Sequence, residues 1–448
     1  MSQPYQNIII CLLSLSLVGL LDKSSSGEYT FRQSFQGWFL QLLQGEKKDF
    51  QKPLITTAFI SDLFQESWQK SPEPCEPKST EPNFLVIGGG GSPESNEIAL
   101  EKNLLYFQRT LKNMGFNTPS TSIFFANGNE EKPSIRYINS QGQEQFKIPN
   151  IPNLNGSATV DNFKNWIEQN KSNQSANKPL FFYFTGHGIL NHENANNNAF
   201  MLWNNTPVTV RNFSNTLDKL PQDTHIVTMM AQCFSGSFAN FIYQNGDPNK
   251  PLAKQTRCGF FATIKTLPSV GCTPEVNEAD YEDYSSSFFA GLSGVNRIGQ
   301  KVTSADYNKD GRVSYSEAHA FAKVDEETSD LPVSTSETWL QEKASKKDID
   351  ELVNIPILEL AKNARPEQKY VISSLVKLLQ FNPQKSSLEN LESLTPDQVV
   401  TQEQKAYKIR LLMELLNVKM EAKVRQNNNQ QDINILDGLI KCESSSWK

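Results

Sequence analysis

The sequence has no excess of positive charge and no strongly basic stripe. Its 43 Lys and Arg stand against 49 Asp and Glu, which gives a formal net charge of -6. Nucleic-acid-binding proteins usually show a basic face, so we expect no nucleic-acid partner. The composition is otherwise that of a globular protein, with 38% hydrophobic and 21% charged residues in 448. That length is enough for about two or three domains.

The chain also lacks the common phosphate-binding and zinc-helix motifs. The glycine run at 88–91 is followed by Pro93 where a dinucleotide fingerprint needs its third glycine, and no Gly-Lys-Ser/Thr follows it. His192-Glu193 has no second histidine at the spacing of a zinc helix. We therefore expect no organic cofactor.

Long apolar runs are scarce, and one stands near the start of the chain at residues 8–21 (IIICLLSLSLVGLL). It is shorter than the ~20 residues of a spanning helix, and its length suits the core of a signal peptide, although no Lys or Arg precedes it. We predict a signal peptide at 1–22 and an exported protein, whether periplasmic, secreted or lumenal. A retained membrane anchor, which would put this segment in contact with a membrane, and a buried helix are the alternatives.

Cysteine is limited to six residues. They are Cys11, Cys75, Cys233, Cys258, Cys272 and Cys442. Loss of Cys11 with a signal peptide leaves an odd number, and in an exported protein this predicts a reactive thiol. We expect Cys233 to be that thiol and Cys258 to pair with Cys272, although sequence alone does not fix disulfide connectivity.

The order of apolar patterns predicts three regions after the signal peptide. Residues 23–80 read as a lead-in that ends in a linker rich in Pro, Glu and Ser. Residues 81–330 alternate short apolar strands with amphipathic helices. Residues 345–448 show apolar residues at helical spacing and no strand pattern.

The alternation within 81–330 predicts the fold class. Strands are expected at 84–88, 122–126, 180–185, 225–231 and 259–263, with helices over 98–114, 160–169 and 210–220 between them. Continuous apolar strands separated by helices are typical of a parallel sheet covered on both faces. We predict an α/β three-layer sandwich with a mostly parallel sheet, followed by an all-helical C-terminal domain.

Two motifs place reactive side chains at the ends of predicted strands. Residues 181–188 read FFYFTGHG and end in His187 and Gly188, and residues 229–238 read MMAQCFSGSF and contain Cys233. Sites in open α/β sheets form outside the carboxyl ends of the strands. A buried cysteine or a structural histidine is the simpler explanation for either residue alone. Together they predict a thiol nucleophile with an imidazole base and backbone amides at 188 and 233 for an oxyanion.

The same two segments resemble the motifs of a known family. Residues 181–188 are similar to the histidine motif of the caspase–legumain group of cysteine peptidases. Residues 231–237 (AQCFSGS) are similar to its cysteine motif, especially the Glu-Ala-Cys-Glu-Ser-Gly-Ser of legumain. The order, His before Cys with a gap near ~50 residues, also matches caspases. The resemblance covers roughly 81–330 and implies the caspase–hemoglobinase topology.

By this resemblance the protein is a cysteine endopeptidase acting on peptide or protein substrates through an acyl-enzyme. His187 would be the general acid/base and Cys233 the nucleophile, with Gly188 beside them in the catalytic site. The acidic residues that flank the cysteine in legumain are replaced by Ala231 and Phe234, so asparaginyl specificity is not implied.

Two further residues are assigned to substrate binding by the same likeness. Asp283 resembles an acidic pocket residue of legumain and would select a basic or polar side chain, whereas a solvated acidic loop is its simpler explanation. Ser235 lies within the cysteine motif and is assigned to substrate binding with it.

A separate motif predicts one calcium site. Residues 306–317 read DYNKDGRVSYSE and fit the EF-hand loop pattern, with Gly311 at the sharp turn. The expected ligands are the side chains of Asp306, Asn308, Asp310, Ser314 and Glu317 and the carbonyl of Arg312. A helix is expected over 318–324, and an Asx-rich turn without a metal is the alternative.

Several functions stay open at this level. The helical tail resembles the legumain pro-domain, which covers the cleft until it is removed, and this is an analogy at the level of the fold. The alternatives to a peptidase are a transpeptidase on the same fold, a non-catalytic calcium-binding pseudoprotease, and a thiol hydrolase of other amides or esters. The sequence does not predict the oligomeric state.

Overall fold

The computed structural model describes residues 81–116, 120–171, 178–393 and 401–448. These described residues all belong to one compact unit. The predicted signal peptide or anchor at 1–22 and the lead-in at 23–80 lie outside the described residues, as do Cys11 and Cys75. No helix within the described ranges is both long and apolar enough to cross a membrane.

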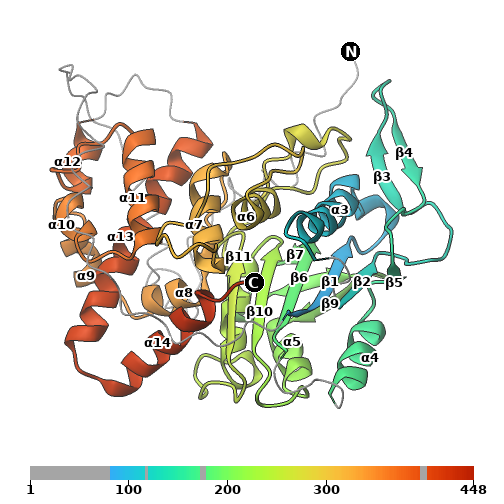
Figure 1. Ribbon diagram of the computed structural model, residues 1–448, viewed down its shortest axis with the longest axis horizontal. Coiled ribbons are helices and arrows are strands. Elements are labelled where there is room, and N and C mark those ends of the chain that lie inside the picture. The colour runs from blue at the N-terminus through green and yellow to red at the C-terminus, as the bar shows by residue number, and fades with distance from the viewer. Residues whose placement is uncertain (1–80, 117–119, 172–177, 394–400) are drawn as a thin grey trace, which may run out of the picture. The chain divides into compact units, whose positions relative to one another are not determined.

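A seven-stranded sheet forms the centre, in the order β12-β11-β10-β6-β1-β2-β5 (Figure 1). The strands are β1 (Asn83–Gly89), β2 (Thr121–Phe125), β5 (Leu154–Gly156), β6 (Leu180–Gly186), β10 (Ile226–Ala231), β11 (Arg257–Phe261) and β12 (Val333–Ser334). Neighbouring strands run parallel except at the β11–β12 edge, where the pairing is antiparallel. The prediction of an α/β fold with a mostly parallel sheet is confirmed.

The strands form where apolar residues run without interruption. Every residue of β6 is buried, as expected for a strand covered on both faces. β11 starts at Arg257, two residues earlier than predicted. An apolar pattern does not include this residue, because arginine is charged, but here its side chain is buried. Arg257 donates to the Phe241 carbonyl at 2.8 Å and to Asp218 at 2.5 Å, and these bonds compensate for burying its charge.

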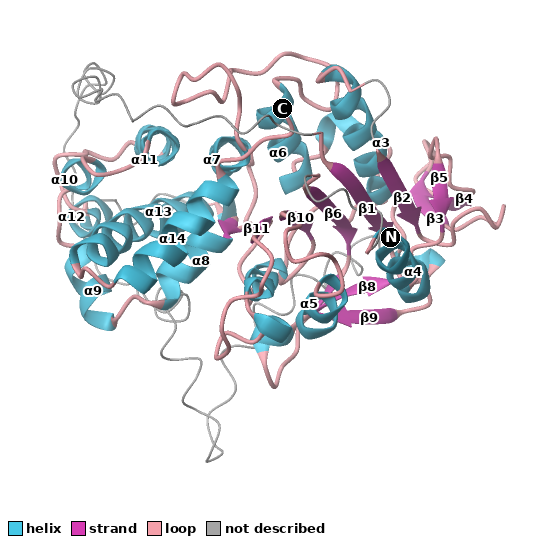
Figure 2. Cartoon of the chain, turned by 60° about the horizontal axis from the view of Figure 1, so that its bottom comes forward, coloured by secondary structure: helices cyan, strands magenta, loops and turns pink. Residues whose placement is uncertain are grey.

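Helices cover both faces of the sheet, which gives three layers (Figure 2). One face carries α3 (Ile98–Asn113), α6 (Tyr284–Ser293) and α7 (Tyr315–Asp325), and the other carries α4 (Val160–Asn170) and α5 (Val210–Leu217). The helices predicted from residues 98, 160 and 210 onward are therefore confirmed. The helix after the 306–317 loop begins at Tyr315, three residues before the predicted start.

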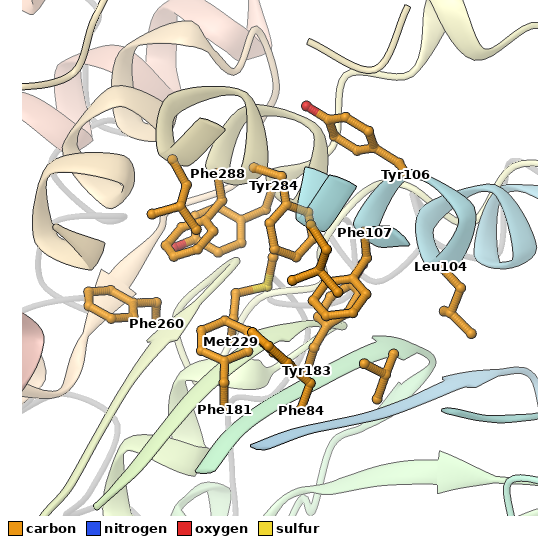
Figure 3. Packing of buried hydrophobic residues seen from close by; sticks show 14 of the residues in the cluster. Phe84, Leu104, Tyr106, Phe107, Phe181, Tyr183, Met229, Phe260, Tyr284 and Phe288 are labelled. Carbon is orange, nitrogen blue, oxygen red and sulfur yellow. The ribbon is translucent and has the colours of Figure 1, made fainter. Parts of the chain in front are cut away.

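The core on the α3/α6/α7 face is rich in aromatic side chains (Figure 3). Phe181 and Tyr183 of β6 point to this face, with Phe84 and Met229 from the neighbouring strands. The rings of Phe84 and Phe107 meet edge to face with centroids 5.7 Å apart, a preferred geometry for aromatic pairs.

Shorter elements surround the sheet. They are the hairpin β3 (Ile135–Ile138) and β4 (Glu144–Lys147), the small sheet β7 (Gly188–Ile189), β8 (Ala199–Leu202) and β9 (Thr206–Thr209), and the 3-10 helices η4 (Pro93–Ser95), η5 (Ala195–Asn197), η6 (Ser235–Ile242), η7 (Gln244–Gly246) and η8 (Glu278–Asp280). β7 follows His187 directly, so the histidine stands between two strands.

The C-terminal region is helical, as predicted. Its helices are α8 (Thr335–Glu342), α9 (Lys346–Leu352), α10 (Ile357–Ala361), α11 (Pro366–Leu378), α12 (Ser387–Glu392), α13 (Gln402–Gln426) and α14 (Gln430–Glu443). Trp447 is 1% exposed, and its ring lies 5.1 Å from those of Phe84 and Phe181. Trp447 therefore completes the core of the sheet domain.

A disulfide joins Cys258 of β11 to Cys442 of α14. The predicted pairing of Cys258 with Cys272 is therefore wrong. The sequence could not reveal the true partner because the two cysteines are 184 residues apart and meet only after α14 has packed on the edge of the sheet. Cys272 remains a thiol.

Candidate active site

His187 and Cys233 follow two neighbouring parallel strands. β6 and β10 pair in a register whose last pair is Thr185 and Ala231. His187 and Cys233 each lie two residues beyond that pair. The carboxyl ends of parallel strands meet at one edge of a sheet. The structure therefore places His187 and Cys233 at the same rim, and the prediction that their strands are neighbours is confirmed.

The backbones touch at this rim. A Cβ built on Gly188 would lie 1.9 Å from the carbonyl oxygen of Cys233, a distance at which the two atoms clash. Glycine is required there because it has no side chain to keep the strands apart. Gly188 opens β7 and pairs with Phe200, and its role in binding an oxyanion stays a prediction.

The thiol of Cys233 is half-buried against the backbone of Ser269. The Ser269 N–H donates to Sγ at 3.3 Å, and the thiol faces the Ser269 carbonyl at 3.5 Å. The N–H donor favours the thiolate, whereas the carbonyl acceptor favours the thiol. The loop that contains Ser269 is thus in a position to tune the reactivity of Cys233.

The chain turns sharply just after Cys233. Phe234 has φ 59° and ψ 20°, in the left-handed region, and η6 begins at the next residue. A non-glycine residue in this conformation costs on the order of 1–3 kcal/mol and is found most often at functional sites. The Phe234 N–H donates to the Leu267 carbonyl at 2.9 Å, which helps to hold the turn.

Two oxygen atoms hold the imidazole of His187. Its Nε2 lies 3.0 Å from Glu97 Oε2 and 2.8 Å from the Ser95 carbonyl. Both neighbours are acceptors, so Nε2 carries a hydrogen. The second oxygen of Glu97 accepts from Arg136 at 2.8 Å, which fixes the carboxylate. Glu97 is thereby set to orient the imidazole.

Charges around the imidazole favour its protonated form. The electrostatic interaction with Cys272 raises the pKa of His187 well above its usual value; burial opposes this, and hydrogen bonds to Cys272 and Glu97 add to it. Burial would raise the pKa of Glu97, but its hydrogen bond to His187, the charge of His187 and the bond from Arg136 together lower it. Imidazolium and carboxylate therefore stabilise one another near neutral pH.

Cys272 is a second thiol at the site. One ligand atom from each of Glu97, His187 and Cys272 lies within 4.8 Å of the others, and Cys272 Sγ is 3.9 Å from the Gly186 carbonyl. The structure thus brings two thiols to this rim. Cys272 lies against the imidazole, and Cys233 lies against the loop at Ser269.

This trio is also the one group of three His, Cys, Asp or Glu donors that lie this close together in the described part of the chain. Carboxylate, imidazole and thiolate are donors that Zn²⁺ accepts. Hydrogen bonding and charge already account for the arrangement, because Nε2 and Oε2 are 3.0 Å apart. We therefore interpret it as an acid–base set.

The predicted substrate-binding residues lie deeper than expected. Asp283 is 3% exposed, caps α6 through the Ser286 N–H at 2.8 Å, and has its Oδ2 3.5 Å from Arg297. A Cβ on Gly271 would lie 2.8 Å from its side chain, so Asp283 stands just behind the Cys272 segment. Ser235 is fully buried and exchanges hydrogen bonds with the backbone of Thr263. Substrate contact by either residue stays a prediction.

The 306–317 loop folds on its own side chains. Asp306 accepts from the amides of Asp310 at 3.1 Å and Gly311 at 3.0 Å, and Asn308 accepts from Asp310 at 2.9 Å. Asp310 in turn accepts from the Arg312 amide at 3.0 Å. The donor types suit Ca²⁺, and the turns hold them in one short loop.

The far end of this loop serves a helix. Ser314 caps α7 and forms a capping box with Glu317. The second oxygen of Glu317 accepts from the amides of Tyr307 and Asn308 at 2.9 and 3.1 Å. Both carboxylate oxygens of Glu317 thus accept hydrogen bonds from the loop. The calcium site and its Asx-turn alternative both stay predictions.

Three residues that shape the site are absent from the predicted set: Glu97, Cys272 and Ser269. Glu97 follows η4, beyond the end of β1, and the rule that sites form at strand ends points to this region. An odd number of cysteines indicates a free thiol but does not show that Cys272 is one. Nothing in the local sequence marks Ser269, because its partner Cys233 is 36 residues away.

The comparisons with known proteins leave this site to be interpreted by itself. No family model matches the chain, and no curated protein matches it. The crystal structure of protein GSU0716 from Geobacter sulfurreducens aligns with a TM-score of 0.31 at 9% identity, covering 54% of this chain and 88% of that chain. A likeness this weak carries no argument about function, which we therefore argue from the site.

Proposed function

We propose that this protein is a cysteine peptidase that cleaves peptide bonds through an acyl-enzyme on Cys233. The observation that carries the proposal is the position of His187, held by Glu97, and of Cys233 just beyond the ends of adjacent parallel strands. A thiol, an imidazole and an orienting carboxylate are the parts that nucleophilic acyl transfer requires. The resemblance of residues 181–188 and 231–237 to caspase–legumain motifs supports a peptide substrate and a caspase–hemoglobinase fold.

In the proposed reaction Cys233, His187 and Glu97 each have one role. The thiolate of Cys233 attacks the substrate carbonyl carbon, and the electron pair of the C=O bond moves to its oxygen. The imidazolium of His187 then gives a proton to the leaving amine as the C–N bond breaks. The neutral imidazole next takes a proton from water, which attacks the thioester and releases Cys233. Glu97 keeps the ring oriented throughout.

The choice between the two thiols favours Cys233. It lies two residues after the end of β10, and the left-handed turn at Phe234 follows it, so rigid elements position its sulfur. Cys272 lies in an irregular segment after Gly271, whose φ is 116°. In this proposal the electrostatic interaction and the hydrogen bond with Cys272 help to keep His187 protonated.

The surroundings of Asp283 support a polar substrate side chain over a basic one. The carboxylate of Asp283 already has a cationic partner, because Arg297 Nη2 lies 3.5 Å from Asp283 Oδ2. It is therefore not available as an unpaired negative charge for a basic substrate side chain. A neutral amide offers both a donor and an acceptor to such a pair. Competition between peptides with glutamine, lysine and arginine before the cleaved bond ranks these preferences.

We also propose that the protein acts in an oxidising compartment and binds one Ca²⁺ at 306–317. The disulfide between Cys258 and Cys442 supports export, since structural disulfides persist mainly outside the cytosol. The calcium ligands would come from Asp306, Asn308 and Asp310. The ion would fix the loop against α7, and no catalytic step passes through it.

A positional peptide library tests the activity. The intact protein is expected to cleave a subset of peptides, and Cys233→Ala is expected to cleave none. Product masses with an added amine separate hydrolysis from transpeptidation, because the amine captures the same acyl-enzyme. Turnover of esters or other amides without any peptide cleavage, or equal activity in Cys233→Ala, would contradict the proposal.

A further inference from the structure

Buried hydrogen bonds link the C-terminal helices to the loop beside Cys233. They begin at Arg410 of α13, which is 2% exposed. Its guanidinium donates to the backbone carbonyls of Lys323 at 3.0 Å, Glu326 at 2.7 Å, Thr328 at 3.1 Å and Asp330 at 2.9 Å. One arginine thus holds the end of α7 and the turn after it in a single shape.

That turn presents the carboxylate of Asp330 to the active-site loop. Asp330 is fully buried. Its Oδ2 accepts from the Ser269 hydroxyl at 2.5 Å, and its Oδ1 accepts from the Val270 amide at 3.1 Å. Hydrogen bonds to a carboxylate are stronger than those between neutral groups. Asp330 therefore anchors Ser269, which contacts the Cys233 sulfur, and the adjacent Val270.

Backbone bonds hold this loop on either side of Ser269. From residue 262 to 277, between β11 and η8, it contains no helix or strand, but the carbonyls of Leu267 and Thr273 accept from Phe234 at 2.9 Å and Ala99 at 3.3 Å. Asp330 holds the residues between them, Ser269 and Val270. The Ser269 N–H that donates to Cys233 Sγ at 3.3 Å belongs to the same residue whose hydroxyl Asp330 holds. A shift of Asp330 would therefore move the donor away from the sulfur.

Charge within the cluster is balanced around one arginine. Glu326 Oε2 lies 4.0 Å from Arg410 Nη2, and Glu326 is buried with Asp330. Burial and the nearby Asp330 raise the pKa of Glu326 well above its usual value. Burial also raises the pKa of Asp330 to about 7, although the hydrogen bond from Ser269 and the charge of Arg410 oppose this.

We propose that Arg410 and Asp330 are positioning residues for the nucleophile, so that the C-terminal helical region builds the active site through Ser269. This inference rests on the proposed role of Cys233, but it is tested on the thiol itself. In this proposal the C-terminal helices support the active site, and activity does not require their removal.

The test is the pH dependence of Cys233 alkylation in the full-length protein. Iodoacetamide is the probe, and mass spectrometry of the Cys233 peptide gives the rate without interference from other thiols. Ser269→Ala removes the bond to Asp330 and keeps the backbone N–H. We expect its profile to move up by about one pH unit and its rate at neutral pH to fall about tenfold, because the thiolate loses an oriented donor.

Two variants control the experiment. Ser336→Ala removes a bond of the same kind, since the Ser336 hydroxyl donates to buried Glu443 at 2.5 Å, and it should leave the Cys233 profile unchanged. Ser269→Thr retains a hydroxyl, so its Cys233 alkylation profile should match that of the intact protein. Asp330→Asn and Arg410→Lys are expected to shift the profile in the same direction as Ser269→Ala.

The outcomes are separable. An unchanged profile in Ser269→Ala, or equal shifts in Ser269→Ala and Ser336→Ala, overturns the positioning role even if Arg410→Lys fails to fold. A Cys233 that titrates like an ordinary thiol in the intact protein also overturns it. The peptidase proposal fails on a different result, the survival of cleavage in Cys233→Ala.

Discussion

Two neighbouring residues, Cys272 and Glu97, raise the pKa of His187, and their contributions differ in size. Cys272 is the larger cause of its raised pKa, and Glu97 the smaller. We predict that Glu97→Gln lowers the pKa of His187 by about one unit and that Cys272→Ser lowers it further. NMR titration of the ring protons measures this, and the chain has only 4 histidines to assign.

Glu101→Gln is the matched control for that experiment. Glu101 lies in the first turn of α3, just after Glu97. It is buried and pairs with Lys147. Among the hydrogen bonds of the described residues, none joins Glu101 to His187. Its substitution should leave the His187 titration where it was. Equal pKa values in the intact protein and Glu97→Gln would remove Glu97 from the catalytic set.

A second residue gives a pH dependence of stability with a definite sign. Burial raises the pKa of Glu443 from 4.5 to about 6, against hydrogen bonds from Ser336 and Thr335. The folded protein therefore binds this proton more tightly than the unfolded chain, and the stability it contributes is lost as pH rises from 4.5 to about 6.

Glu443→Gln should remove that part of the pH dependence. We expect the free energy of unfolding of the intact protein to fall by about 2 kcal/mol more than that of the variant across this window. Denaturant unfolding between pH 4 and pH 7 measures the difference. Parallel curves for the two proteins would show that Glu443 titrates normally.

At the scale of elements, the contact between the ends of β6 and β10 sets the site. Gly188→Ala puts a Cβ where the Cys233 carbonyl lies, 1.9 Å away, so the strand ends must separate. We predict a loss of about 1–3 kcal/mol in stability and a large loss of peptide cleavage. Gly438→Ala in α14 is the control, because a Cβ there meets nothing within 4 Å. Normal cleavage by Gly188→Ala would contradict the close rim.

The 306–317 loop gives a prediction for the metal. Millimolar Ca²⁺ should raise the thermal midpoint by a few degrees through binding to the folded state, and Asp310→Asn should abolish the rise. Differential scanning fluorimetry with and without chelator measures it. Asp247→Asn, which changes a similar turn closed by the Asn249 amide at 3.0 Å, should keep the full response. No calcium-dependent shift would leave the loop as an Asx-rich turn.

How much of this was predictable differs between elements and contacts. The strands at 84–88 and 180–185 were predictable because uninterrupted apolar runs can be satisfied only by burial on both faces. His187 and Cys233 were predictable because strand ends meet at one rim. Glu97 was missed although it follows β1, since its partner Arg136 is 39 residues away. Asp330 and Arg410 act only through tertiary contacts, which no local pattern records.

At the scale of the molecule, the C-terminal region is part of one folded unit. Trp447 fills the core between Phe107 and Phe181, with ring centroids 5.6 and 5.1 Å away. Deletion of residues 447–448 should lower the free energy of unfolding by about 3–5 kcal/mol. Deletion of Lys448 alone is the control and should cost little. Equal stability of the two shortened chains would mean that the tail is only loosely attached.

The same packing predicts how activity responds to truncation. A chain that ends before α9 loses Cys442, Trp447 and Arg410 together, so it should lose its core packing, its disulfide and the anchor of Ser269. The legumain-like expectation is the reverse, a gain of activity on removal of the helices. Comparison of peptide cleavage by the two chains separates a supporting role from an inhibitory one.

The central claim is that Cys233 is the nucleophile served by His187, and covalent trapping tests it most directly. A peptidyl acyloxymethyl ketone is incubated with the intact protein, and the modified residue is identified by peptide mass mapping. The account predicts modification at Cys233, retained in Cys272→Ser and lost in Cys233→Ala and His187→Ala. Modification at Cys272, or none in the intact protein, would contradict it.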